Sequence, residues 1–157
     1  MEKEFMTFKI ADGIYGIDIL EIKEVQAVSQ VTPVPLTDEV IVGLLNLRGQ
    51  IVTVIDAGIP LGYPKRRLVP SSYLLIVKPQ KQHQPDAQRV RMLTHEAPVA
   101  LLIDRIGDVI SCGESQIEAA PSHLDEGLYL DGALKWEDSL IGLIGISKLL
   151  NYNRLGG

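Results

Sequence analysis

The sequence predicts a mainly β protein whose short strands close into barrels or stack as a sandwich. Its apolar residues are chiefly Ile, Val and Leu, with aromatics at only 5%, and β-branched residues favour pleated strands. Glycine and proline, at 14 and 9 copies, recur along the whole chain and cut it into short apolar segments. We expect about ten strands with little helix. An open sheet of that many strands leaves edges and curls, so closed barrels or a sandwich are favoured.

The N-terminal third predicts a hairpin followed by a helical turn. Residues 5–10 alternate between two faces, and Asp12-Gly13 supplies a turn into a second strand at 14–17. Residues 18–25 have both helical and alternating spacing. That mixture predicts a brief helical turn that passes into a strand.

The most distinctive segment is a pair of apolar strands around Arg48-Gly49, where glycine permits the positive φ of a tight turn. The polar stretch 78–88 is predicted to be a solvated loop, and Ser147 to cap a short C-terminal helix. We expect a single domain over 5–151 and a flexible tail over 152–157. The remaining strands are predicted at 43–47, 50–56, 73–77, 99–103, 109–111, 128–135 and 140–144.

Composition excludes several classes of function. The formal charge of −5 and the pI near 5.2 argue against a nucleic-acid binder, which needs a clustered basic face. The single cysteine allows no internal disulfide, which favours a reducing cytoplasm. The charged N-terminus is unlike a signal peptide, and no apolar run approaches the ~20 residues of a membrane span.

A search for catalytic chemistry finds candidates but no strong signature. No two of the histidines, His83, His95 and His123, have metal-ligand spacing, so we expect no metal and no cofactor. Cys112 would act as a nucleophile if a base approached it, but its neighbours offer none, and a small buried hydrophobe is the favoured interpretation.

Two strand-end carboxylates give a second enzymatic alternative. Asp56 and Asp104 each close an apolar strand, so they either face one another as an acid–base pair or accept hydrogen bonds from the turns that follow them. Because the sequence contains no strong catalytic signature, it favours a binding module over an enzyme. A small β-barrel enzyme and an oligonucleotide-binding barrel remain the alternatives.

Arg48 is the most informative charge. It lies in a turn between two very apolar strands, either solvated or clamping a carboxylate through two parallel hydrogen bonds. Glu24, alone among the apolar neighbours of 22–28, is the candidate partner.

The same residues carry a family likeness. Asn46-Leu47-Arg48-Gly49, followed by Ile51-Val52-Thr53-Val54-Ile55-Asp56, resembles the signature of the CheW-like domain family. The likeness covers nearly the whole chain, through 15–22, Thr32-Pro33-Val34-Pro35, 100–104 with 109–111, and 143–150. The chain departs from the family in the long polar segment 78–91 and at Ala57-Gly58.

The resemblance implies a fold and a non-enzymatic role. The expected fold is two intertwined five-stranded SH3-like β-barrels that share a hydrophobic core, with a short C-terminal helix. The expected function is a cytoplasmic adaptor, without cofactor, nucleic acid or membrane insertion, that is recruited to membrane-associated chemoreceptor arrays. Chemotaxis and a non-flagellar output, such as pili or gliding motility, both remain open.

The resemblance also implies two contact sites. Residues matching Met6, Ile19 and Ile22 would bind the regulatory domain of a CheA-type histidine kinase. In the groove between the barrels, Leu47, Arg48 and Ile103 would bind chemoreceptor cytoplasmic tips, with Glu24 orienting Arg48.

Overall fold

The structure is a computed structural model that describes residues 2–28, 31–33, 39–65, 72–78, 98–120 and 129–150. Almost all of the predicted polar loop, the three histidines and the predicted tail lie outside these residues. No helix in the described ranges is both long and apolar enough to span a bilayer. The elements are β1 (Glu2–Ile10), β2 (Gly13–Asp18), η1 (Ile19–Glu21), β3 (Ile22–Ala27), β4 (Ile41–Leu47), β5 (Gln50–Asp56), β6 (Tyr73–Val77), β7 (Val99–Ile103), β8 (Arg105–Gly113), η2 (Glu114–Gln116), β9 (Ile117–Glu118), β10 (Leu130–Trp136), β11 (Ser139–Ile144) and α2 (Ile146–Leu150).

Most strands occur where the sequence predicts them, and the helical turn that passes into a strand is η1 followed by β3. Two local predictions are corrected. The strand predicted at 109–111 extends over the whole of β8, because β1 supplies a pairing partner from Glu2 to Lys9. Ser147 does not cap the C-terminal helix, since it lies inside α2, which begins at Ile146, and Leu149 N donates to Gly145 O at 2.9 Å.

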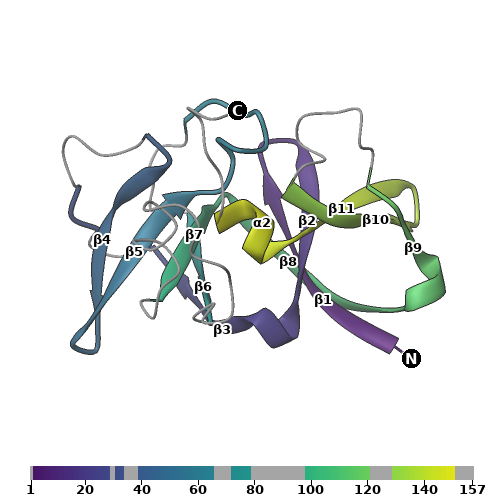
Figure 1. Ribbon diagram of the computed structural model, residues 1–157, viewed down its shortest axis with the longest axis horizontal. Coiled ribbons are helices and arrows are strands. Elements are labelled where there is room, and N and C mark those ends of the chain that lie inside the picture. Colours follow the sequence, from purple (N-terminus) through teal and green to yellow (C-terminus); the bar gives the residue numbers. More distant parts are fainter. Residues whose placement is uncertain are drawn as a thin grey trace.

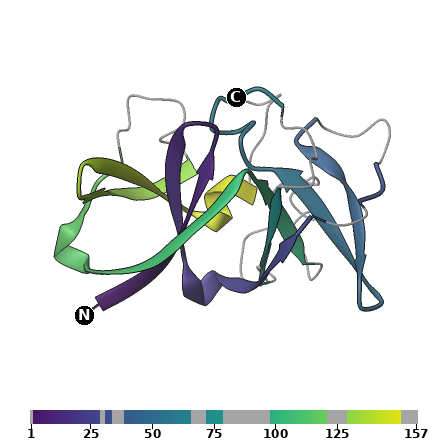
Figure 2. The same ribbon diagram turned by 180° about the vertical axis from the view of Figure 1, so that it is seen from behind.

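The first sheet has six strands in the order β8-β1-β2-β11-β10-β9. Its two outer strands, β8 and β9, are consecutive in the chain and are joined only by the three residues of η2. The sheet therefore curls until its edges are linked by one bent stretch of chain, visible as the green ribbon in Figures 1 and 2.

The second sheet has five strands in the order β3-β6-β7-β5-β4. The chain that leaves β3 returns to β4, where Thr32 and Leu44 exchange two backbone hydrogen bonds of 2.8 Å. With β8 and β9 counted as one bent strand, each sheet contains five strands, as predicted. The second sheet is inserted in the chain between β2 and β8 of the first, so the two are intertwined.

The core has three parts. A shared cluster joins both sheets and the buried face of α2, which lies between them (Figure 1). Each sheet also has one further cluster of its own, which fills its interior. Strands β6 and β7 have both faces covered, one by the shared cluster and one by the second sheet's interior, so their sequences are almost uniformly apolar.

Candidate functional site

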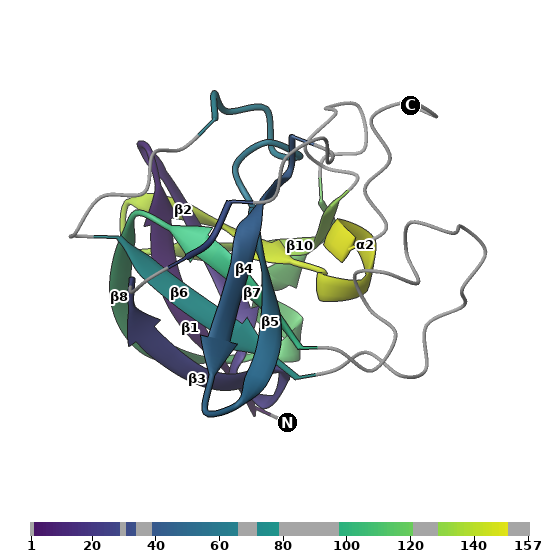
Figure 3. The same cartoon turned by 90° about the vertical axis from the view of Figure 1, so that its left-hand side faces the viewer.

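The turn between β4 and β5 lies at the lower end of the second sheet in Figure 3, close to β3. Arg48 and Gly49 have positive φ angles of 52° and 85°, and the side-chain oxygen of Asn46 accepts a 2.9 Å hydrogen bond from Gly49 N. Consecutive positive φ angles match the twist of the flanking strands in a two-residue hairpin. A left-handed arginine is uncommon, so the turn needs contacts that fix it.

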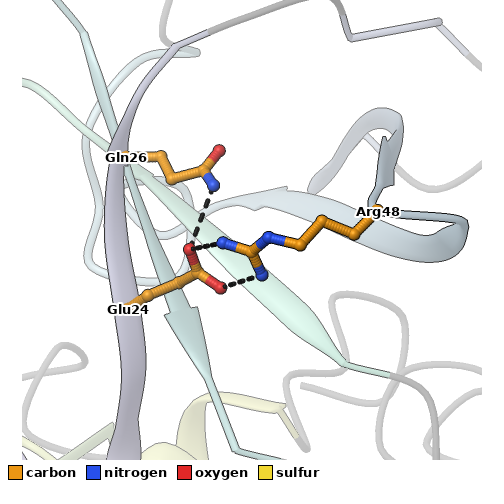
Figure 4. Close-up of polar contacts among 3 residues, drawn as sticks. All are labelled: Glu24, Gln26 and Arg48. Carbon is orange, nitrogen blue, oxygen red and sulfur yellow. Dashed lines mark hydrogen bonds and ion pairs between the residues drawn. The ribbon is translucent and has the colours of Figure 1, made fainter.

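Those contacts come from β3 (Figure 4). Arg48 Nη1 donates to Glu24 Oε2 at 2.9 Å, and Arg48 Nη2 donates to Glu24 Oε1 at 2.7 Å. The ion pair that the sequence predicts is therefore present, in a two-bond geometry that specifies orientation as well as charge. Because β3 and β4 are the outer strands of the second sheet, the pair also links its two edges.

A third side chain completes the group. Gln26 Nε2 donates to Glu24 Oε1 at 3.0 Å. The hydrogen bonds from Arg48, and then the one from Gln26, hold the pKa of Glu24 below its ordinary 4.5, while Glu24 raises the pKa of Arg48. Both residues are thus charged at neutral pH. The Arg48 side chain is nevertheless 67% exposed, against 21% for Glu24, so the guanidinium is oriented but accessible.

The structure brings together only part of the set assigned to the receptor. Leu47 is half-buried against the interior of the second sheet, next to Arg48. Ile103 has no exposed surface, because it lies on the central strand β7 with its side chain in the shared core. A fully buried side chain offers nothing for a partner to touch, and the parallel register of β5 and β7 puts Ile103 at the end of β7 away from the Arg48 turn.

The residues assigned to the kinase lie where the first sheet connects to the second. Met6, Ile19 and Ile22 are all half-buried, and Met6 and Ile22 pack against the shared core. Between Ile19 and Ile22, in η1, Leu20 is 71% exposed, the largest value among the exposed large hydrophobic side chains of the described residues.

Sequence reasoning missed Leu20. Its turn is capped by Asp18, whose Oδ1 accepts a 2.9 Å hydrogen bond from Leu20 N. An aspartate side chain often accepts a hydrogen bond from the backbone N–H two residues on, so Asp18 is itself a turn signal. A turn at 18–20 would have indicated an outward-facing leucine, but the mixed periodicity of the segment does not show which side chains face outward.

The enzymatic alternatives find no support in these residues. Asp56 is fully buried and accepts from Gly58 N at 2.9 Å, which is the hydrogen bond from the following turn that the simpler interpretation predicts. Asp104 also accepts a turn hydrogen bond, but its donor at 2.6 Å is Ala11 N in the distant β1–β2 turn and not the turn that follows it. Cys112 lies in the apolar interior of the first sheet, where burial, and then Glu2, raise its pKa away from a reactive thiolate. The described ranges contain no group of three or more potential metal ligands.

Comparisons with known proteins agree with this architecture. The family model described as the CheW-like domain matches residues 4–154. The protein named Chemotaxis protein CheW from Klebsiella aerogenes is 29% identical over 155 residues, which is 98% of this chain and 84% of that protein. The Bacillus subtilis protein of the same name is 25% identical, over 95% of this chain and 87% of that protein.

A solved structure is also similar. The crystal structure of the scaffolding protein TtCheW from Thermoanaerobacter tengcongensis superposes with a TM-score of 0.80 at 29% identity, covering 98% of this chain and 90% of that one. The match over 4–154, the two intertwined sheets of six and five strands and the braced Asn-Leu-Arg-Gly turn lead to one conclusion. The chain belongs to the CheW-like domain family.

Proposed function

We propose that this chain is a scaffold in chemotaxis signalling that couples chemoreceptors to a CheA-type histidine kinase. The observation that supports this most is the CheW-like match over nearly the whole chain, together with the likeness to a solved scaffolding protein. CheW-like scaffolding proteins are not enzymes, so the prediction that the chain has no catalytic activity is confirmed. Its work is then to hold two partners in a fixed relation, near the membrane-bound receptors and in the cytoplasm.

The proposed kinase surface is formed by Met6, Ile19, Leu20 and Ile22. Three of these side chains are half-buried and Leu20 is largely exposed, so a partner would cover apolar area that solvent now touches. A few exposed aliphatic side chains backed by a packed core suit the moderate, reversible interfaces of signalling proteins. The expected partner is the regulatory domain of the kinase.

The proposed receptor surface is centred on Leu47 and Arg48. The brace from Glu24 holds the guanidinium in one orientation before any partner arrives, and a side chain ordered in advance loses less conformational entropy on binding. Ile103 is left out of this surface because it is fully buried.

Reconstitution with a purified kinase and a receptor fragment tests the proposal. Leu20→Asp should abolish kinase binding, because a charge on this largely exposed position would then face the apolar kinase surface. Arg48→Ala should retain kinase binding but lose receptor binding. Both should abolish receptor-stimulated kinase activity and leave the circular dichroism spectrum intact. Lys135→Ala, an exposed change on β10, serves as the control. Full activation by both site variants would contradict the proposed surfaces.

A further inference from the structure

Gln26 has no role in either proposed surface, yet from β3 it donates a hydrogen bond to the carboxylate that braces the Arg48 turn. Glu24 Oε1 accepts from both Arg48 Nη2 and Gln26 Nε2, while Oε2 accepts from Arg48 Nη1 (Figure 4). The carboxylate is therefore held from two directions, by the hairpin turn and by its own strand. A carboxylate that is held by an amide keeps the orientation that a two-bond arginine pair requires.

A bulge in β3 separates Ile22 from the face that carries Glu24 and Gln26. Ile22 pairs with Val77 and Glu24 with Ile76, so two steps along β3 correspond to one step along β6, and Lys23 is the extra residue. Ile22 consequently packs against the shared core, whereas Glu24 and the residue two positions on, Gln26, both face the Arg48 turn.

The Arg48–Glu24 ion pair still offers N–H donors but carries little net charge. The guanidinium has five N–H donors, of which Glu24 accepts two, so three remain on a side chain that is 67% exposed. The positive charge is matched by the carboxylate beside it. A carboxylate on a partner would be repelled by Glu24 about as strongly as it is attracted by Arg48. An uncharged oxygen would only accept hydrogen bonds from the remaining N–H groups.

We propose that Gln26 is a positioning residue that acts through Glu24, and that Glu24, Gln26 and Arg48 form a preassembled, charge-neutral cluster. Its free N–H groups recognise uncharged oxygen acceptors on the receptor, such as backbone carbonyls or side-chain amides, and not carboxylates. The partner named here rests on the proposed function, while the positioning role concerns the isolated chain.

The positioning role is tested first on the isolated chain by NMR, with the Glu24 carboxyl titrated in wild type, Gln26→Leu and Gln50→Leu. The groups that act on this carboxyl are Arg48, Gln26 and Lys23, and only one of them changes. Gln26→Leu should raise the pKa of Glu24 and broaden the Arg48 Nε–H signal. Gln50→Leu, an exposed change on the same hairpin, should alter neither. An unchanged titration in Gln26→Leu overturns the positioning role.

Charge neutrality is tested by adding sodium phosphate to the isolated chain. The Arg48 Nε–H signal should stay in place in wild type, because the guanidinium is already paired. It should move in Glu24→Gln, where the positive charge is no longer matched. A shift in wild type as large as that in Glu24→Gln overturns the claim of a neutral cluster.

Binding to a receptor fragment then tests the recognition chemistry. Between about 50 and 500 mM NaCl, wild-type affinity should change by no more than about twofold, because screening weakens charge–charge contacts most. Gln26→Leu should weaken receptor binding several-fold and leave kinase binding unchanged. A tenfold loss of wild-type affinity with salt would show a charged partner and overturn the recognition claim. Absence of any wild-type binding would contradict the proposed receptor contact itself, while the two NMR results would still decide the cluster.

Discussion

Replacing Leu20 by alanine should separate kinase binding from folding. The side chain is 71% exposed, so the folded chain buries less than a third of it. Complete burial of a leucine side chain contributes roughly 1.5–3 kcal/mol. Leu20→Ala should therefore lower the free energy of unfolding by less than about 1 kcal/mol. If the kinase covers the exposed part fully, the same change should cost about 1–2 kcal/mol of binding free energy and weaken binding by roughly five- to thirtyfold.

The assay is titration calorimetry of the chain with the regulatory domain of the kinase, combined with urea unfolding of the chain alone. Leu140→Ala is the matched control, because Leu140 is also an exposed leucine, at 58%, but lies on β11 outside the proposed surface. The control should bind normally. The reasoning is refuted if Leu20→Ala binds within about twofold of wild type, a difference of only ~0.4 kcal/mol, or if both variants lose affinity equally.

Three further outcomes follow from the packing. Ile103→Ala should lower the free energy of unfolding by about 2–5 kcal/mol, since Ile103 is fully buried; a much smaller loss in urea unfolding would contradict its place in the shared core. Gly43→Ala would put a Cβ against the carbonyl oxygen of Thr32, so the bridge to Leu44 should open and hydrogen exchange at the Leu44 amide should accelerate; unchanged protection would count against this. Cys112, buried and with a raised pKa, should resist thiol reagents in native buffer and react on unfolding, and rapid native labelling would show the opposite.

How far the sequence specifies the fold depends on how many faces of a strand are buried. The runs at 73–77 and 99–103 have the same bounds in the sequence prediction and in the structure, because strands covered on both faces are continuously apolar. The same uniformity does not show which way each side chain points. Nothing in the letters of 99–103 distinguishes Ile103, which points into the shared core, from a residue at a surface. The two-residue strand β9 is too short to give any pattern.

The polar contacts follow a similar division. The Glu24–Arg48 pair was predictable, because an arginine in a tight turn between apolar strands needs an acceptor. Gln26 was not, because regular alternation would put it on the same face as Ile22, and the bulge at Lys23 that separates them is a property of the pairing between β3 and β6. Register arises from two strands together, so a single segment does not reveal it.

Of the two chain connections between the sheets, β2 to β3 and β7 to β8, the first runs between the two proposed surfaces. The chain leaves β2, presents Leu20 in the capped turn η1, and enters β3, where Glu24 braces Arg48. Behind this connection, Ile22 packs into the core that both sheets share. A partner at η1 and a partner at the Arg48 turn would therefore be held at a fixed separation by packed structure rather than by a flexible linker. That arrangement provides what a scaffold requires.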